Sequence, residues 1–412
     1  MHLPLNFPSR RTVLIGFSAI AVSACSKPNP SAGALPGTWE EIMAAARGQT
    51  VRWNAWAGDP KINAYIGWVA EILRSRFDIR LEHLKTDNTA SGVTRLIADK
   101  TAKRTSEGSI DLMWINGENF AAAKQQGLLF GPFTDRLPNF KLVDTIGKPS
   151  TILDFTLPTQ GFESPWGMAQ ITFFYDQARL PNPPRSLEAL MAFATKKPGR
   201  FTYPAPGDFV GVTFLKQILS ELIPDNDALK RQVNPTEFPS MTAPLWDYLE
   251  RLHPKLWRAA QAFPPDYPTL MRLLEDQEVD LALAFNPAEG TTGVTSGRLP
   301  STTRAYTLDN GTITNSHFVA IPFNSSAREG ALVTANFLLS PEAQARKADP
   351  KIWGDPDVLD LSRLTPKDRT LFDAILDHPS MPRPEDQART LPEPHPSWHL
   401  ALSEAWRARF AA

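Results

Sequence analysis

The chain has 412 residues, with 43 basic and 44 acidic side chains and a formal net charge of −1. This balance, without any run of basic residues, argues against a nucleic-acid-binding surface. The length predicts two or three domains, and the apolar content is adequate for large hydrophobic cores.

The first 24 residues have the parts of a secretory signal peptide. Arg10-Arg11 precede an apolar run from Val13 to Ala24, which as a helix is only about 18 Å long and too short to span a bilayer. The run ends in Val22-Ser23-Ala24-Cys25, which resembles a lipobox, so Cys25 is predicted to be lipidated and to anchor the chain in the periplasm or cell envelope. An ordinary signal peptide beside a chance cysteine is the alternative. The general and twin-arginine export routes both stay open, as does the membrane leaflet that carries the anchor.

Three strand–loop–helix units follow a proline- and glycine-rich segment, residues 25–38, that is predicted to be a flexible tether. The predicted strands are 50–56, 79–84 and 110–115, and the loops after them are 57–59, 86–89 and 116–119. Strands that alternate with helices indicate a mostly parallel sheet with right-handed crossovers. The three loops are therefore expected to meet at one edge of this sheet, where such sheets bind ligands.

A second α/β region follows Trp166. Its predicted elements are a strand at 200–203, a loop at 204–208, a helix at 209–222, and a buried strand at 278–285 with a loop at 286–290. Asn310-Gly311 predicts a hairpin turn, and a strand at 318–322 leads into the helices of the C-terminal part.

Common catalytic motifs are absent from the sequence: we find no P-loop, dinucleotide-binding glycine pattern, HExxH pair or GxSxG elbow. The seven histidines form no short-spaced pair, and Cys25, the only cysteine, is assigned to lipid. The sequence therefore predicts neither a metal site nor a cofactor. Because many active sites lack a local signature, this argues only weakly against an enzyme.

Several segments across the chain resemble the solute-binding proteins of bacterial ABC importers, and among them the YnjB-type family. The matching segments are Val51-Arg52-Trp53-Asn54-Ala55-Trp56-Ala57-Gly58-Asp59, Asp111 to Phe120, Pro165 to Gln170, Pro198 to Pro204 with Asp208-Phe209, Asn315 to Pro322, and Asn336 to Gln344. The resemblance implies a two-lobed α/β fold of the type II periplasmic-binding-protein class. Each lobe would hold a mixed, mostly parallel sheet flanked by helices, with a hinge between the lobes.

The expected domains combine the signal peptide and tether, read from the residues, with the lobes that this resemblance implies. They are the signal peptide 1–24, the tether 25–38, lobe 1 (first part) 39–165, lobe 2 166–300, and 301–412 for the return to lobe 1 and the C-terminal helices. The chain crosses between lobes near 166–175 and 286–317. The implied function is capture of a small polar or cationic solute, with a thiamine-like cation as one candidate, and its delivery to a permease with ATPase subunits. The implied protein is a monomer and not an enzyme.

The predicted ligand-binding residues lie at strand ends and at the crossings between lobes: Trp56, Gly58, Asp59, Asn116, Glu118, Asn119, Trp166, Tyr203, Asp208, Asn286, Asn315 and His317. Their acids, amides and aromatic rings, with few arginines, favour a neutral or cationic solute over an oxyanion.

Structural roles compete with ligand binding at several of these positions. Asp59 and Asp208 also fit as helix caps, Trp166 as a packed hinge residue, and His317 as a structural histidine. Two other functions stay open: an envelope hydrolase that uses Glu118 with Asp208, and a scaffold for envelope proteins.

Overall fold

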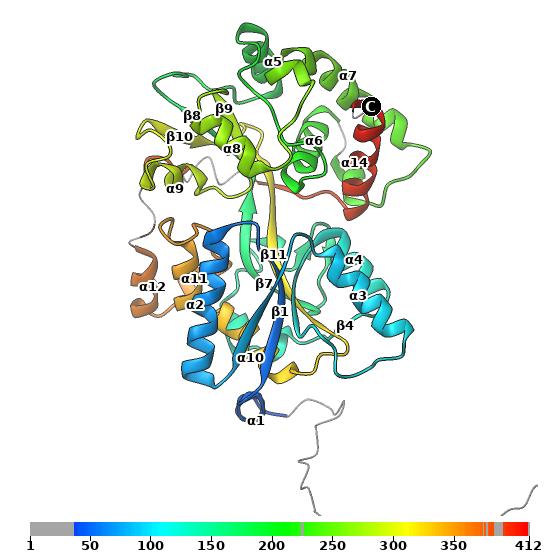
Figure 1. Cartoon of the computed structure of the whole chain (residues 1–412), viewed down its shortest axis with the longest axis vertical. Helices are drawn as coiled ribbons and strands as arrows, with labels where there is room; N and C mark the ends of the chain where they lie inside the picture. Colours follow the sequence, from blue (N-terminus) through cyan, green and yellow to red (C-terminus); the bar gives the residue numbers. More distant parts are fainter. Residues whose placement is uncertain (1–36, 224–225, 374, 376–377, 383–389, 411–412) are drawn as a thin grey trace, which may run out of the picture. The chain divides into compact units, whose positions relative to one another are not determined.

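The computed structural model describes residues 37–223, 226–373, 375, 378–382 and 390–410 (Figure 1). The predicted signal peptide, Cys25 and the tether as far as residue 36 lie outside the described residues. The buried side chains gather around two separate sheets, which we call the sheets of the first and second lobes.

The first lobe is built on a mixed sheet with the strand order β12-β11-β3-β1-β2, to which β4 and β7 add by pairing with β11. Its strands are β1 (Thr50–Trp56), β2 (Arg80–Thr86), β3 (Leu112–Ile115), β4 (Leu129–Phe130), β7 (Glu163–Gln170), β11 (Thr312–Pro322) and β12 (Thr390–Pro392). β1 pairs in parallel with β2 and with β3. The three predicted strand–loop–helix units are thus confirmed.

Helices and one small hairpin complete the first lobe. The helices are α1 (Trp39–Ala46), α2 (Pro60–Phe77), α3 (Ala90–Thr101), α4 (Gly117–Gln125), α10 (Arg328–Leu338), α11 (Pro341–Ala348) and α12 (Pro366–Asp373). The hairpin pairs β5 (Leu153–Asp154) with β6 (Leu157–Pro158). Its turn places Phe155 in a left-handed conformation with φ 54°, a position that matters for the site below.

The second lobe has a three-stranded antiparallel sheet in the order β10-β8-β9. Its strands are β8 (Thr172–Asp176), β9 (Leu281–Ala284) and β10 (Thr303–Tyr306), and its helices are α5 (Leu187–Lys196), α6 (Phe209–Leu222), α7 (Phe238–Leu252), α8 (Tyr267–Glu275), α9 (Glu289–Thr295) and α14 (Pro396–Phe410). The strand predicted at 200–203 makes only one parallel bridge, from Phe201 to Leu281. Pro204 explains this, because it has no N–H to extend the ladder.

Two connections carry the chain between the sheets. β7 of the first sheet leads through Ile171 into β8 of the second, and β10 of the second leads back into β11 of the first. The turn at Asn310-Gly311 therefore joins strands of different sheets, and the predicted hairpin does not form. A turn signal specifies the local reversal of the chain but not the partner of each strand.

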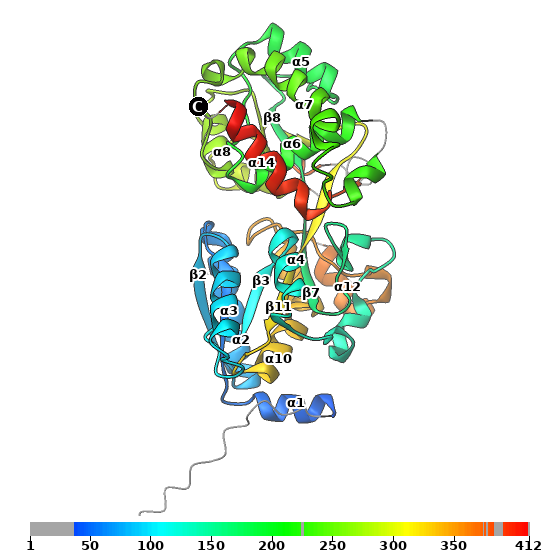
Figure 2. The same ribbon diagram turned by 90° about the vertical axis from the view of Figure 1, so that its right-hand side faces the viewer.

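The C-terminal helix α14 belongs to the second lobe. Figures 1 and 2 place it beside α6, and its Trp398, Leu402 and Trp406 are buried in the second-lobe core. The predicted domain boundaries at 165/166 and 300/301 stay a prediction. The buried clusters assign β10 and α14 to the second lobe.

Candidate functional site

The loop after β1 is shaped by Asp59 and Gly58. The Asp59 carboxylate accepts a hydrogen bond from the backbone amide of Lys61 (2.7 Å) and so caps α2, while Pro60 occupies the first helical position. A Cβ atom at Gly58 would overlap the indole ring of Trp56. A residue with a side chain therefore does not fit at position 58, because the half-buried ring of Trp56 occupies that space.

The loop after β3 presents Asn116, Glu118 and Asn119 at the start of α4. Gly117 adopts φ 61°, and its amide donates to the buried Asp154 carboxylate (2.6 Å). The Asn119 amide donates to Glu118 at 3.4 Å, and the Asn116 side chain makes no capping hydrogen bond. Burial raises the pKa of Glu118, because the charged carboxylate loses contact with water.

A buried lysine faces this loop from the second lobe. Lys216 of α6 forms an ion pair with Glu393, and neither side chain is exposed. Its Nζ lies 4.8 Å from the ring centre of Phe155 in the first lobe and 5.4 Å from that of Phe209 in the second. We call these four residues, Lys216, Glu393, Phe155 and Phe209, the Lys216 cluster.

The Lys216 cluster extends to a predicted site residue. Asn315 of β11 donates to Glu393 (3.2 Å), and the Lys216 charge acts on Glu118 and lowers its pKa against the effect of burial. Sequence reasoning missed Lys216, Glu393 and Phe155. A signal for Lys216 was available, because it is the one lysine in the apolar helix 209–222.

A group of acids lies around Tyr267 at the junction of the lobes. Asp208 caps α6 by accepting from the amide of Val210 (2.9 Å), and Asp266 caps α8 by accepting from that of Thr269 (2.8 Å). Burial raises the pKa of Tyr267, and the carboxylates of Glu289, Asp59, Asp208 and Asp266 raise it further. We call these four carboxylates the Tyr267 acid group; one of them, Asp59, belongs to the first lobe.

Two of the predicted site residues, Trp166 and Tyr203, are packed in cores. Trp166 is fully buried, with its ring centre 5.3 Å from that of Trp53, 4.9 Å from Trp114 and 5.4 Å from Trp353. Tyr203 is fully buried in the second lobe, where its hydroxyl pairs with His253 (2.8 Å) and accepts from Trp406 (2.9 Å).

His317 pairs through Nε2 with Asp355 at 2.9 Å, and Lys347 donates to the same carboxylate at 2.6 Å. Asn286 lies between the lobes: its side-chain amide donates to the carbonyl of Trp353 (3.2 Å). The structure thus gives Trp166, Tyr203, His317 and Asn286 structural partners, and their contact with a solute stays a prediction.

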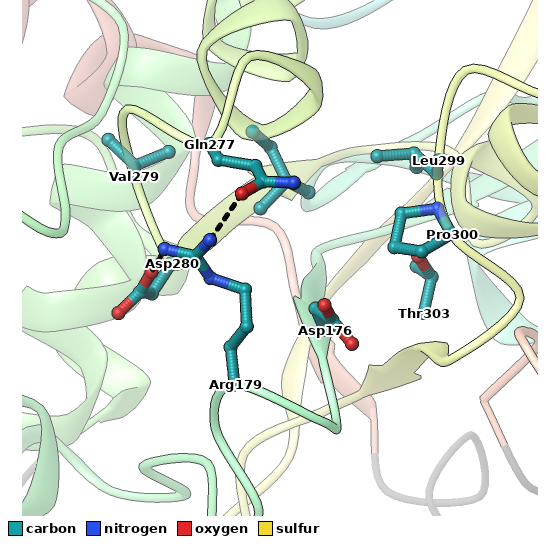
Figure 3. Close-up of a pocket in the computed structure, with 9 residues that line it drawn as sticks. Asp176, Arg179, Gln277, Val279, Asp280, Leu299, Pro300 and Thr303 are labelled. Carbon is teal, nitrogen blue, oxygen red and sulfur yellow. Dashed lines mark hydrogen bonds and ion pairs between the residues drawn. The ribbon is translucent and has the colours of Figure 1, made fainter.

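A small cavity in the second lobe is lined by an ion cluster and not by the predicted residues. Its volume is about 20 Å³, which suits one water molecule, and Arg179 reaches Gln277 and Asp280 beside it (Figure 3). Burial raises the pKa of Asp280, but hydrogen bonds from Arg200 (2.5 Å) and Lys197 (3.2 Å) outweigh it and leave that pKa below its ordinary value. This cluster is structural.

A larger groove, of about 640 Å³, lies between α9 of the second lobe and the α11–α12 region of the first. Thr291 and Thr295 line one side, and Glu342 and Arg346 line the other. Within the described residues, no group of three or more His, Cys, Asp or Glu side chains could hold a metal ion. No helix in the described ranges is both long and apolar enough to cross a membrane.

Comparison with known proteins gives a sequence family and a curated relative. Residues 69–356 match the family described as bacterial extracellular solute-binding protein. The chain is similar to Protein YnjB of Escherichia coli (strain K12), with 43% identity over 372 residues that cover 90% of this chain and 94% of that protein.

Solved structures share the fold at low sequence identity. The periplasmic binding protein AfuA from Actinobacillus pleuropneumoniae, with exogenous fructose-6-phosphate bound, matches with a TM-score of 0.60 and 13% identity over 88% of this chain and 99% of its own. A putative spermidine/putrescine ABC transporter protein from Listeria monocytogenes matches with a TM-score of 0.58 and 14% identity over 88% and 98%. The two-lobed α/β fold of periplasmic binding proteins is thereby confirmed.

Proposed function

Because the chain belongs to the family of bacterial extracellular solute-binding proteins, we propose that it captures a small polar or cationic solute between its two lobes. Closure about the hinge strands β7 and β11 holds the solute, which is then delivered to the permease and ATPase subunits of an ABC importer. A thiamine-like cation remains one candidate.

The observation that carries this proposal is the meeting of polar groups from both lobes. The first lobe contributes Glu118 and Asp59, and the second contributes Lys216 and the other members of the Tyr267 acid group, which are Asp208, Asp266 and Glu289. The contacts of Phe155 with Phe209 and Lys216 support a junction in which these groups face each other. Such convergent polar groups at a junction of two lobes are typical of small-molecule sites.

The proposal also covers the location of the protein, its oligomeric state and its lack of catalytic activity. Cys25 carries a lipid that anchors the monomer in the cell envelope, and the segment 25–38 lets the two-lobed body reach its permease. The protein turns over no substrate. Acidic side chains outnumber basic ones at the junction, which supports a cationic solute.

Native mass spectrometry of the protein purified without refolding tests this function. We expect a bound small molecule that is released on unfolding, and a melting temperature that rises when the released compound is added back. Glu118→Gln should lose most of the adduct, and the exposed-site control Glu250→Gln should keep it. Absence of any adduct and of any thermal shift, or conversion of the compound into product, would contradict the proposal.

A further inference from the structure

Glu289 differs from most buried acids of the described chain because its carboxylate has no partner. The residue is 7% exposed, and no described residue forms a hydrogen bond or an ion pair with its carboxylate. Asp111, by contrast, accepts hydrogen bonds from Ser325 and Ser326, and Asp355 is paired with Lys347. Leaving a buried carboxylate unpaired costs free energy, so its retention points to a ligand.

The cations near Glu289 do not pair with it. Arg298 of the same lobe is already bound to Glu275 and Ser296. Lys61 of the first lobe acts on the carboxylate only at long range and opposes the rise in pKa that burial causes. The position for a positive charge next to Glu289 is therefore not filled by a side chain of the described protein.

The other carboxylates of the Tyr267 acid group have a structural task that Glu289 lacks. Asp59, Asp208 and Asp266 each accept a backbone N–H at the start of a helix. They leave a negative field around the half-buried Tyr267 ring, and the ring itself attracts cations over its face. Glu289 is the member of the group that is free to form a direct ion pair.

Glu163 is a second buried acid without a hydrogen bond, but its situation is different. Both of its carboxylate oxygens are sealed from solvent in the first lobe, next to Asp154. Glu289 instead begins α9, directly after the loop at the carboxyl end of β9, and the Asp59 and Lys61 charges of the opposite lobe act on it. Among the buried acids in the part of the chain that the structure describes, Glu289 combines an unpaired carboxylate with a place at the lobe junction.

We propose that Glu289 is the second-lobe carboxylate that pairs with a positively charged nitrogen of the solute, and that the solute is an organic cation held against Tyr267. This inference rests on the proposed function and deepens it. Lys61 could pair with the same carboxylate and form an ion pair between the lobes. The test must therefore distinguish a Glu289–solute pair from a Glu289–Lys61 pair.

Calorimetric titration of the full chain at pH 7.5 with thiamine, choline and putrescine provides the test. The neutral counterparts 3,3-dimethylbutan-1-ol and butane-1,4-diol serve as controls for choline and putrescine. We expect at least one cation to bind, and any matching neutral compound to bind at least tenfold more weakly. Glu289→Gln should weaken cation binding at least tenfold, because a charge-assisted contact is lost.

Two further variants test whether the loss of cation binding is specific to Glu289. Lys61→Met should leave cation binding unchanged or tighter, whereas weaker binding would favour the rival ion pair and overturn the proposal. Glu221→Gln removes another largely buried acid of the same lobe, one that is hydrogen-bonded to Gln217, and should leave binding unchanged. A neutral counterpart that binds as tightly, unchanged cation binding in Glu289→Gln, or no binding of any of the three cations would also overturn it.

Native mass spectrometry distinguishes an error in the role of Glu289 from an error in the proposed solute-binding function. If the protein carries a neutral or anionic solute, the role of Glu289 is wrong and the solute-binding function stands. If it carries no solute and none of the titrated compounds raises the melting temperature, both are wrong.

Discussion

At the scale of single residues, Asp208 shows how one carboxylate can cap a helix and still cost stability. Burial raises its pKa from 3.8 to about 6, although the amides of Val210, Gly211 and Tyr267 oppose the rise. The stabilising effect of the bound proton is complete below about pH 4 and is lost as the pH rises through about 6. Asparagine keeps the cap without the charge.

Asp208→Asn is therefore expected to stabilise the solute-free protein at pH 7.5, by at most about 3 kcal/mol, since one pKa unit corresponds to about 1.4 kcal/mol. Urea unfolding of both proteins at pH 4 and pH 7.5 measures this. The two proteins should have equal stability at pH 4, which serves as the internal control. A variant that is less stable at pH 7.5 would show that the carboxylate charge strengthens the cap by more than its burial costs.

Residue roles were harder to predict than residue positions. Trp166 lies in the middle of β7 and Tyr203 follows the single bridge at Phe201, and both side chains are buried in cores. The sequence marks where a strand lies but does not tell which of its side chains face the core. Asp59 and Asp208 are caps, as their place before Pro60 and Phe209 predicted. Lys216 and Glu393 lie 177 positions apart; only the packing of α14 and its preceding segment against α6 brings them together.

At the scale of elements, the turn between β3 and α4 depends on Gly117. Its φ of 61° costs other residues about 1–2 kcal/mol, and a Cβ atom there would lie 2.6 Å from Cζ of Phe155. We expect Gly117→Ala to lower the free energy of unfolding by at least about 2 kcal/mol and to displace Glu118. Urea denaturation measures the first effect.

Gly67→Ala is the matched control for this substitution. Gly67 lies inside α2 on an exposed face, and a Cβ atom there would contact nothing within 4 Å. It should raise stability by about 0.5–1 kcal/mol, because alanine restricts the unfolded chain. Equal effects of the two substitutions would contradict the role given to the Gly117 turn.

The secondary structure was largely predictable because its signals are local. Asp59-Pro60, Asp208 and Ser340-Pro341 each mark a helix start that the structure contains. Pairing between strands depends on distant partners, and here the predictions failed. Asn310-Gly311 joins two sheets instead of one hairpin, and Pro204 reduces the expected strand to a single bridge.

At the scale of the whole molecule, the Lys216 cluster links segments that otherwise belong to different lobes. Lys216 lies on α6 of the second lobe, Phe155 on the first-lobe hairpin, and Glu393 directly after β12, which pairs with β11. Breaking a buried ion pair leaves an uncompensated charge and typically costs about 3–5 kcal/mol. Lys216→Met should therefore destabilise the protein by about this amount at pH 7.5.

A double-mutant cycle with Glu393→Gln measures whether the pair itself is responsible. The double variant should be more stable than the sum of the single effects predicts, by about 1 kcal/mol or more, because it leaves no buried charge. Lys230→Met breaks the exposed pair of Lys230 with Asp227 (2.6 Å) and should change stability far less than Lys216→Met does, because solvent screens that pair. Strictly additive single effects would show that the pair contributes no coupling between these segments.

The pH dependence of the stability of Lys216→Met provides an independent test of this ion pair. Burial raises the pKa of Glu393, and Lys216 is the strongest influence that lowers it again. Without Lys216 the pKa of Glu393 in the folded protein rises further, so the variant gains stability as the pH falls and the carboxylate takes up a proton. The loss in free energy of unfolding, relative to the unaltered protein, should therefore be smaller at pH 5 than at pH 8. A loss that is the same at both values would mean that Glu393 does not carry the uncompensated charge, and that Lys216 stabilises the lobe junction through its contacts with Phe155 and Phe209 instead.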